Sequence, residues 1–511
     1  MSGTMSGTMN GALNSAMTRA LSAAPLALFA YAVALVLAAA TVRTGFVSDD
    51  AMRLWAGAIT AGEGDVAIGR IVAAYPTFPF WAAALTAFVA PVGTPAPALV
   101  AAMLFALIAG VWFVSFRSAG FTLVSTVLAT LLLVFHPALL RAEINGPSDM
   151  FLAAFLFMLG IALYDLRARG ATSDVMAVGL ALLGLAFSHP MGAAIALAAV
   201  PFLAFAVRPA LVANSALNVV VALVFPTVFA VGAFTYISWV FPGAGWSFFA
   251  APAESLATWR ASVAHVFGDG LTGIAALDAS LATAIALVFG APVVYVALRW
   301  VARRRPLVAP ALVFAAAVIA AAALTIASGL FGEPTAITVA APVLAAVVIA
   351  RVPELQARPA AALTLLVAGW VGGLVSLPFV DPAAAGHLRA AIAGGESERT
   401  DALAAGGAAI GYDGVLADTE NAPALVLGRG SARGMYGPGS EPYTLTLIFS
   451  RLDAPYVAVP DPHSAGGAHD RLNKAFPALY RRGAPGYRIV YQNDTWRLYG
   501  RIPNVAIQKN Y

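Results

Sequence analysis

Residues Ala98–Phe116 read ALVAAMLFALIAGVWFVSF and contain no charged side chain. A helix needs about 20 apolar residues to cross the hydrocarbon core of a bilayer, so this run predicts a membrane-spanning helix. The composition agrees, because 60% of the 511 residues are hydrophobic and only 11% are charged. A soluble protein carries about 25% charged residues, and disorder requires low hydrophobicity. A single soluble domain and a disordered chain are therefore both excluded.

Ten other apolar runs predict further crossings, which makes eleven in all. They are Pro25–Val42, Phe121–Phe135, Met150–Tyr164, Val175–Phe187, Met191–Val207, Ser215–Val240, Ala279–Leu298, Leu307–Ser328, Thr335–Ala350 and Ala360–Val380. A twelfth run, Thr77–Val92, is short and is followed by Pro95 and Pro97. We interpret it as a re-entrant or interfacial segment. Residues 1–24 lack the basic start of a secretory signal peptide, so we expect a cytoplasmic leader that is not removed.

Arginine is unequally distributed between the two sets of loops. With the N-terminus in the cytoplasm, the inner loops hold eleven arginines and three acidic residues, whereas the outer loops hold five arginines and ten acidic residues. Cytoplasmic loops carry an excess of Lys and Arg, so this pattern favours eleven crossings and a Thr77–Val92 segment that does not cross. The expected location is a bacterial inner membrane.

The last part of the chain, residues 381–511, is richer in charged residues, Gly and Pro. We expect a soluble domain of about 130 residues there, large enough for its own core, and eleven crossings place it in the periplasm. Expected strands are Ala424–Leu427, Tyr443–Phe449, Tyr456–Val459 and Tyr487–Tyr491, the last pairing with Thr495–Ile502, and expected helices lie near Thr400–Ala409 and Asp470–Arg481. The predicted fold is mainly α: a transmembrane helix bundle over residues 25–380 and a C-terminal α/β or α+β domain.

Composition also limits the chemistry. The chain has no cysteine, which excludes disulfides, thiolate nucleophiles and thiolate metal sites. Its net charge of +4 is modest and does not suggest a nucleic-acid partner.

The first outer loop, residues 43–97, contains two adjacent carboxylates, Asp49 and Asp50, a few residues beyond the first crossing. Ser48 or Asp49 can cap a helix over Ala51–Ala61, and acidic side chains are favoured in a first helical turn. We expect this helix to lie at the membrane interface, with Met52, Trp55 and Ile59 on one face. The alternative is that the acidic pair is only a polar helix start.

The second outer loop, residues 136–149, contains Arg141, Glu143 and Asp149 in a short connection between two crossings. Asp149 stands at the start of a helix and could be no more than a cap. Further polar groups expected on the same side are His189 in a Ser-His-Pro sequence, Arg260, His265, and Glu333 before a proline. His-Pro and Glu-Pro often mark only a helix start.

Together these side chains are a more specific signal than any one of them. Ionisable groups near membrane depth are costly and usually mark function. A carboxylate can act as a general base on an acceptor, and two or three carboxylates can hold Mg²⁺ or Mn²⁺. A cation or an arginine would neutralise a departing phosphate. Such a set suits group transfer from a lipid-phosphate donor.

The chain resembles the GT-C-fold glycosyltransferases, the group that includes protein O-mannosyltransferases and the aminoarabinose transferase of lipid A. The resemblance rests on Asp49-Asp50 after the first crossing, on the segment Tyr75-Pro76-Thr77-Phe78-Pro79-Phe80-Trp81, and on the pair Arg141 and Asp149. An outer C-terminal domain after an odd number of crossings completes it. The chain departs from the family pattern in having Asp-Asp where Asp-Glu is commoner.

The resemblance implies a polyprenyl-phosphate sugar as donor and a lipid, glycan or protein as acceptor. Asp49 or Asp50 would be the acceptor-activating base, and Asp50 with Asp149 would hold a divalent cation if one is used. Substrate-binding roles are expected for Arg53, Tyr75, Arg141, Glu143, His189, Arg260, His265 and Glu333. We expect Asp49, Asp50 and Asp149 to face one lipid-accessible cavity.

Two other classes of function compete with this interpretation. A transporter or flippase for a lipid-linked glycan would also have many crossings, but it should place ionisable residues near the bilayer midplane. The predicted crossings contain almost no charge, and no internal repeat is visible. An assembly or sensor protein would be expected to concentrate its charged groups in the C-terminal domain, where basic and acidic residues nearly balance.

Overall fold

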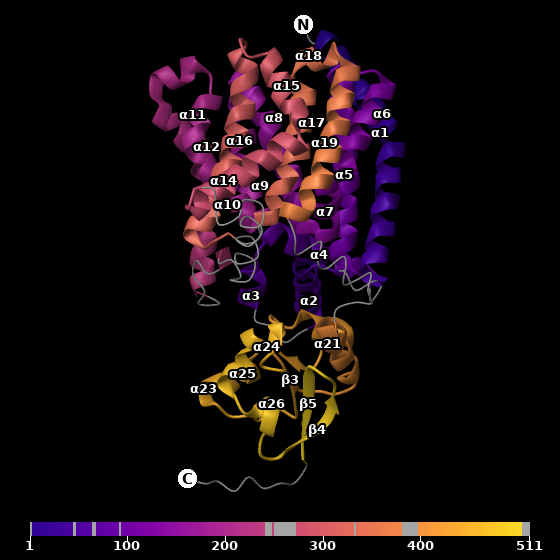
Figure 1. Cartoon of the computed structure of the whole chain (residues 1–511), viewed down its shortest axis with the longest axis vertical. Helices are drawn as coiled ribbons and strands as arrows, with labels where there is room; N and C mark the ends of the chain where they lie inside the picture. Colours follow the sequence, from indigo (N-terminus) through magenta and orange to yellow (C-terminus); the bar gives the residue numbers. More distant parts are fainter. Residues whose placement is uncertain are drawn as a thin grey trace. The chain divides into compact units, whose positions relative to one another are not determined.

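The structure is a computed structural model, and it describes residues 3–43, 47–63, 68–90, 94–240, 248–249, 272–331, 334–380 and 397–502. The chain divides into two compact units (Figure 1). The helical unit comprises Met1–Ala39, Ala101–Thr235 and Trp246–Gly386. The C-terminal unit comprises Ala40–Val100, Tyr236–Gly245 and His387–Tyr511. Each unit is described by itself below.

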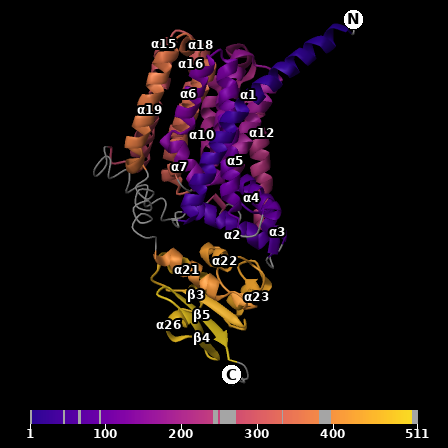
Figure 2. The same cartoon turned by 90° about the vertical axis from the view of Figure 1, so that its right-hand side faces the viewer.

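The helical unit is built from helices that run mostly alongside one another (Figure 2). They are α1 (Gly3–Arg43), α5 (Ala96–Ser118), α6 (Leu123–Val134), α7 (Pro137–Asn145), α8 (Pro147–Ala168), α9 (Thr172–Ser188), α10 (Pro190–Ala199), α11 (Leu203–Ala206), α12 (Pro209–Val240), α14 (Ala275–Gly290), α15 (Pro292–Trp300), α16 (Arg305–Ser328), α17 (Ala340–Arg351), α18 (Pro353–Gln356) and α19 (Pro359–Val380). Short 3-10 turns, η1 (Val200–Phe202) and η3 (Pro334–Val339), precede α11 and α17.

Within the described residues, six helices are long and apolar enough to cross a membrane. The number rises to eight if two bent pairs each count as one crossing: α6 with α7, bent by 55°, and α14 with α15, bent by 80°. The chain is therefore a multi-pass membrane protein.

The eleven predicted crossings all fall on apolar helices, but not all of those helices are full-length spans. Three of them correspond to shorter apolar helices, namely Thr172–Ser188, Pro190–Ala206 and Ile337–Arg351. The runs Phe121–Phe135 and Ala279–Leu298 correspond to the two bent pairs. A proline follows the break in both pairs, and a hydropathy profile does not register the change of direction that it introduces.

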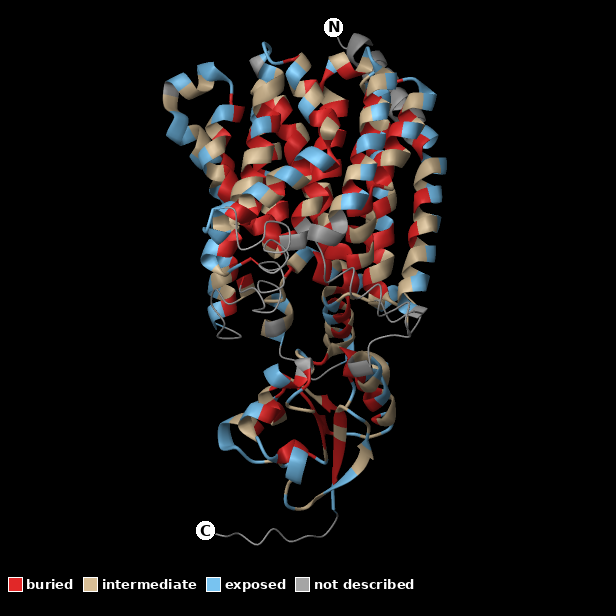
Figure 3. Ribbon diagram, viewed as in Figure 1, coloured by how far each residue is buried: buried red, intermediate tan, exposed pale blue. Residues whose placement is uncertain are grey.

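The helical unit has a buried interior and apolar outer faces. Helix α17 is an inner helix, because all of its residues 340–349 are buried. Figure 3 shows buried residues filling the interior of the helical unit. The outer faces instead expose large apolar side chains such as Phe225 and Phe229 on α12, which is expected of a surface that meets lipid.

The C-terminal unit combines helices from the first loop with a small mixed α/β domain. The first-loop helices are α2 (Asp49–Glu63), α3 (Ile68–Val72) and α4 (Thr77–Val89). The domain contributes α21 (Ser397–Ala408), α22 (Pro423–Arg429), α23 (Glu441–Phe449), α24 (Ala465–His469), α25 (Arg471–Ala475) and α26 (Leu479–Arg482), with strands β1 (Val415–Leu416), β2 (Met435–Tyr436), β3 (Tyr456–Pro460), β4 (Tyr487–Gln492) and β5 (Trp496–Arg501).

The five strands form one sheet in the order β2-β1-β3-β5-β4. Strand β1 lies between β2 and β3 and is parallel to both. Strand β5 is antiparallel to β3, with Val457 opposite Tyr499, and β4 and β5 form an antiparallel hairpin. The sheet is therefore mixed, with a parallel half at β1 and an antiparallel half at β5.

Several local predictions for this domain are confirmed and two are wrong. The predicted strands Tyr456–Val459 and Tyr487–Tyr491 and the hairpin with Thr495–Ile502 are present, as is the helix near Thr400–Ala409. The predicted strands Ala424–Leu427 and Tyr443–Phe449 are instead helices α22 and α23. Each begins with a proline in its first turn, which favours a helix start, and a short apolar run does not distinguish a strand from a buried helix.

The predicted helix near Asp470–Arg481 is also divided. It becomes two short helices, α25 and α26, because Pro477 lies between them and cannot donate a helical hydrogen bond. Each of the two retains a buried leucine, Leu472 and Leu479, in the same apolar cluster.

Helix α2 belongs to the core of the C-terminal unit. Met52 and Ala56 of α2 are buried in one cluster with Ala402 and Ala405 of α21 and Leu425 of α22. Ile59 packs against the same cluster, so Met52 and Ile59 share one apolar face as predicted, and that face is covered by protein side chains. The expected location of the helix at the membrane interface stays a prediction. The sequence shows that α2 has an apolar face but not which partner covers it.

Candidate functional site

The start of α2 is held by a residue from the C-terminal domain. Ser48 caps the helix, accepting a hydrogen bond from the Ala51 amide at 3.1 Å. Arg399 of α21 donates to a carboxylate oxygen of Asp49 and to the Val47 carbonyl, both at 2.8 Å. The Asp49 side chain is 55% exposed while that of Arg399 is only 17% exposed. Asp49 therefore has a structural partner and lies open to water.

Asp50, Arg53 and Tyr75 are the other predicted site residues in this unit. Asp50 occupies the first turn of α2 and is half-buried, whereas Arg53 is exposed. Tyr75 is half-buried just before α4. Asp50 is therefore less open to water than Asp49.

A second group of predicted residues meets where α7 joins α8 in the helical unit. Asn145 ends α7 and Asp149 lies in the first turn of α8, with Gly146 between them at a φ of 123° that favours glycine. Asn145 donates its amide to Asp149 at 2.8 Å, and Arg141 donates to the Asn145 side-chain oxygen. His189 approaches the other Asp149 oxygen at 3.2 Å. The structure thus brings Arg141, Asp149 and His189 together.

The contacts of His189 define its tautomer. Its Nδ1 accepts a hydrogen bond from the Met191 amide at 2.9 Å, which requires a lone pair on that nitrogen. The proton therefore resides on Nε2 and is donated to Asp149. The His189 and Asp149 side chains are only 7% and 8% exposed. His189 is a neutral donor to a buried carboxylate, and binding a donor phosphate would require it to give up that contact.

His136 repeats this arrangement, and the sequence reasoning missed its role. Its Nδ1 accepts from the Ala138 amide at 3.2 Å and its Nε2 faces the Gly369 carbonyl at 3.2 Å. The shared signal was a histidine before a proline, His-Pro, at a helix start. At the break between α6 and α7, the Phe135 carbonyl accepts a hydrogen bond from the Trp370 indole at 2.8 Å.

The two bends of the helical unit lie beside His136. A Cβ built on Gly290, the last residue of α14, would lie 3.8 Å from the His136 ring. One built on Gly373 of α19 would lie 2.5 Å from the same ring. The imidazole therefore packs beside both broken helices, and the absence of a side chain at Gly373 leaves it room.

Glu143 is buried in α7, and among the described residues its Oε2 has no hydrogen-bond partner. The hydroxyl of Ser148, in the first turn of α8, is also buried and without a partner in the described part of the molecule. Buried polar atoms without partners are rare and call for an explanation, such as a bound water, ion or ligand. A substrate-binding role for Glu143 is compatible with this placement and stays a prediction.

Three predicted residues, Arg260, His265 and Glu333, lie outside the described residues. Asp50 belongs to the C-terminal unit and Asp149 to the helical unit, so the expected common cavity stays a prediction. Across the part of the chain that the structure describes, no three His, Asp or Glu side chains are grouped as metal ligands would be. The expected Mg²⁺ or Mn²⁺ site at Asp50 and Asp149 likewise stays a prediction.

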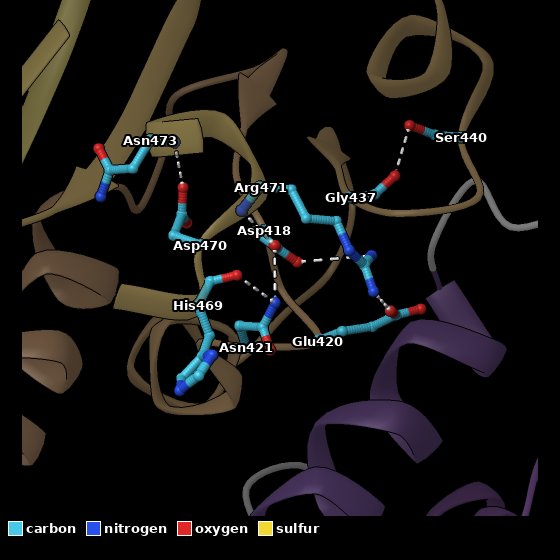
Figure 4. Close-up of polar contacts among 9 residues, drawn as sticks. All are labelled: Asp418, Glu420, Asn421, Gly437, Ser440, His469, Asp470, Arg471 and Asn473. Carbon is cyan, nitrogen blue, oxygen red and sulfur yellow. Dashed lines mark hydrogen bonds and ion pairs between the residues drawn. The ribbon is translucent and has the colours of Figure 1, made fainter. Parts of the chain in front are cut away.

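The sequence reasoning also missed a polar cluster at the end of β1, which we call the β1-edge cluster: Asp418, Glu420, Asn421, Asp470 and Arg471 (Figure 4). Asp418 lies two residues beyond the end of β1 and accepts from the Asn421 side-chain amide at 2.8 Å and the Arg471 backbone amide at 2.9 Å. The Arg471 guanidinium contacts Glu420 at 2.7 Å and lies 3.8 Å from Asp418. The available signal was an acidic residue directly after an apolar run.

Burial affects two members of this region strongly. It raises the pKa of Asp470 to about 7, and the nearby Asp418 carboxylate acts in the same direction. It also raises the pKa of Tyr443, whose phenol lies in the field of Asp418, Asp470 and Glu420. The cluster is therefore a place where a carboxyl group changes charge near neutral pH.

No protein-family model matches the chain, and no curated protein matches it.

Proposed function

We propose that the chain is an inverting glycosyltransferase that moves a sugar from a polyprenyl-phosphate donor to an acceptor at the membrane surface. The observation that supports this most is the buried Asp149, held by Asn145 and His189 beside Arg141 in a membrane protein. Charged groups at such positions are costly and usually functional. In this proposal, a carboxylate at the start of α2 supplies the general base.

In the proposed reaction Asp50 acts as the general base. It removes the proton from an acceptor hydroxyl, whose oxygen attacks the anomeric carbon of the donor sugar. The bond from that carbon to the phosphate oxygen breaks, the electron pair leaves with the polyprenyl phosphate, and the configuration at carbon inverts. The positive charge of Arg141 stabilises the phosphate that leaves.

The proposed orientation places the C-terminal domain outside the cytoplasm. It follows from eleven crossings, three of them by the shorter apolar helices, and from the excess of arginine in one set of loops. A periplasmic reporter joined after Tyr511 should be active, and a cytoplasmic reporter joined near Arg304 should be active. The reverse pattern would overturn this orientation.

A second candidate is a transporter for a lipid-linked glycan. Two broken helices meet beside His136, and discontinuous helices often surround the binding site of a transporter. The buried side chains of His136, Glu143, Asp149 and His189 also weaken the argument that the crossings lack ionisable groups.

One experiment separates the two candidates. The purified chain is reconstituted in liposomes with a radiolabelled polyprenyl-phosphate sugar and an extract of envelope lipids and glycans. A glycosyltransferase releases unlabelled polyprenyl phosphate and transfers the label to an acceptor. A transporter moves the intact labelled donor between leaflets with no bond broken, and that result would refute the proposal.

A further inference from the structure

We propose that the β1-edge cluster binds a neutral, hydroxyl-rich ligand, a saccharide, between the Arg471 guanidinium and the Asp418 carboxylate. This site is separate from the residues of the proposed transfer reaction. Its test needs no transfer activity, so its failure and the failure of the proposed function are distinguishable.

The first support is the position of the cluster in the sheet. Strand β1 is parallel to β2 on one side and to β3 on the other, so the chain changes its winding direction across β1. In open α/β sheets ligands bind outside the carboxyl ends of the strands at such a switch point. Asp418 stands at that end of β1, and the segment from Gly437 to Ser440 stands at the same end of β2 (Figure 4).

The second support is a buried carboxylate oxygen that lacks a donor. The Asp418 side chain is 0% exposed, and its Oδ1 forms no hydrogen bond within the described residues. The nearest cation is the Arg471 guanidinium at 3.8 Å, which is beyond hydrogen-bond distance. The Tyr443 hydroxyl is also buried and unpartnered in the described structure. A hydroxyl placed between Asp418 and Arg471 would donate to the carboxylate and accept from the guanidinium.

The third support is access from the solvent. The side chains of Arg471 and Glu420 are 42% and 46% exposed, and an Arg471 nitrogen lies 3.8 Å from the buried Asp418 oxygen. In the proposal, the partly exposed arginine side chain moves to admit the ligand to this oxygen, and Glu420 serves as a second acceptor. Planar carboxylate, amide and guanidinium groups offer the paired donors and acceptors that vicinal hydroxyls require.

Charge selects among the ligand classes. Two carboxylates, Asp418 and Glu420, flank the one guanidinium of Arg471, so an anion such as phosphate is repelled by the excess of negative charge. A metal ion would compete with Arg471 for the same oxygens, and the described residues include no group of three suitable ligands. Two carboxylate acceptors favour a ligand with many donors. A neutral polyol meets these conditions.

The test is binding of free sugars to the full chain in detergent micelles, measured by saturation-transfer NMR. The probes are D-glucose, D-mannose, D-galactose and L-arabinose, with inorganic phosphate and glucosamine as charged comparisons. At least one neutral sugar should bind saturably. Absence of saturable binding by every neutral sugar, or binding of phosphate or glucosamine alone, would overturn the proposal.

Variants locate the binding. Arg471→Met and Asp418→Asn should each weaken sugar binding by about tenfold or more, since each substitution leaves a buried polar partner unmatched. Arg471→Met is the safer variant for folding, because that side chain is partly exposed. The matched controls Arg451→Met and Glu441→Gln alter exposed charges outside the cluster and should bind within about twofold of the unmodified chain. Unchanged binding by Arg471→Met would place the sugar elsewhere and refute the assignment.

Discussion

Asp470 should make the stability of the C-terminal domain depend on pH. Its carboxyl group is buried, with Asp418 from the β1 edge, Tyr443 from α23 and its neighbour Arg471 as the charged or titratable groups around it. One oxygen caps α25 by accepting from the Asn473 amide at 2.7 Å. Asp470→Asn removes the titration and keeps the cap, because asparagine is an equally good capping residue.

The expected magnitude follows from the two pKa values. The folded-state pKa is about 7 against an unfolded value of 3.8. The folded state thus holds a proton that the unfolded state has lost, so stability is greatest below pH 3.8 and falls as the pH rises through 7. Relative to its value at acid pH, the unfolding free energy falls by about 2 kcal/mol at pH 5 and by about 4 kcal/mol at pH 8. The difference is roughly 2–3 kcal/mol of unfolding free energy, as an upper bound.

Amide hydrogen exchange of peptides covering β3 and β5 in the full chain measures this stability without unfolding the membrane helices. Asp470→Asn should protect these strands more than the unmodified chain at pH 8, and much less so at pH 5. Comparing both proteins at each pH cancels the intrinsic pH dependence of exchange. Equal protection at both pH values would refute a buried, proton-retaining Asp470.

Two further predictions concern the residues that hold Asp49 and Asp149 in place. Asp49→Asn and Arg399→Met should each lower the free energy of unfolding by about 1 kcal/mol. The double variant should lose less than the sum of the two, because each single variant already removes the Asp49–Arg399 contact. Full additivity in thermal unfolding would show that the pair is not coupled. His189→Ala should cost roughly 2–4 kcal/mol, since it removes the α10 cap and one donor to the buried Asp149. A thermal midpoint in detergent equal to that of the unmodified chain would contradict that role.

Sequence patterns predicted the apolar helices because hydropathy is a local property of the chain. Each of the eleven predicted runs is helical, yet the ends of α6 and α14 at the two bends contact α19, which is far away in the sequence. In the C-terminal domain, alternation and aromatic content identified β3, β4 and β5. The prolines at the starts of α22 and α23 were the local signal that could have corrected the two wrong strands.

The candidate site could be predicted only in part, because a sequence pattern shows neighbours along the chain and not contacts between distant residues. Arg141, Asn145 and Asp149 are four residues apart, so one helix-to-helix junction brings them together. Arg399 lies 350 residues from Asp49, and no local pattern links them. Asp418 and Arg471 similarly meet only because β1 and α25 belong to one domain.

The most direct test of the central claim is sugar transfer by single variants of the acidic pair at the start of α2. The assay follows transfer of the radiolabelled sugar from the polyprenyl-phosphate donor to the acceptor in liposomes. Asp50→Asn should lower the rate by about 100-fold or more, as loss of a general base does, while Asp49→Asn should keep most of it. Full activity of Asp50→Asn, or loss of activity in Asp49→Asn alone, would contradict the assignment of Asp50 as the base.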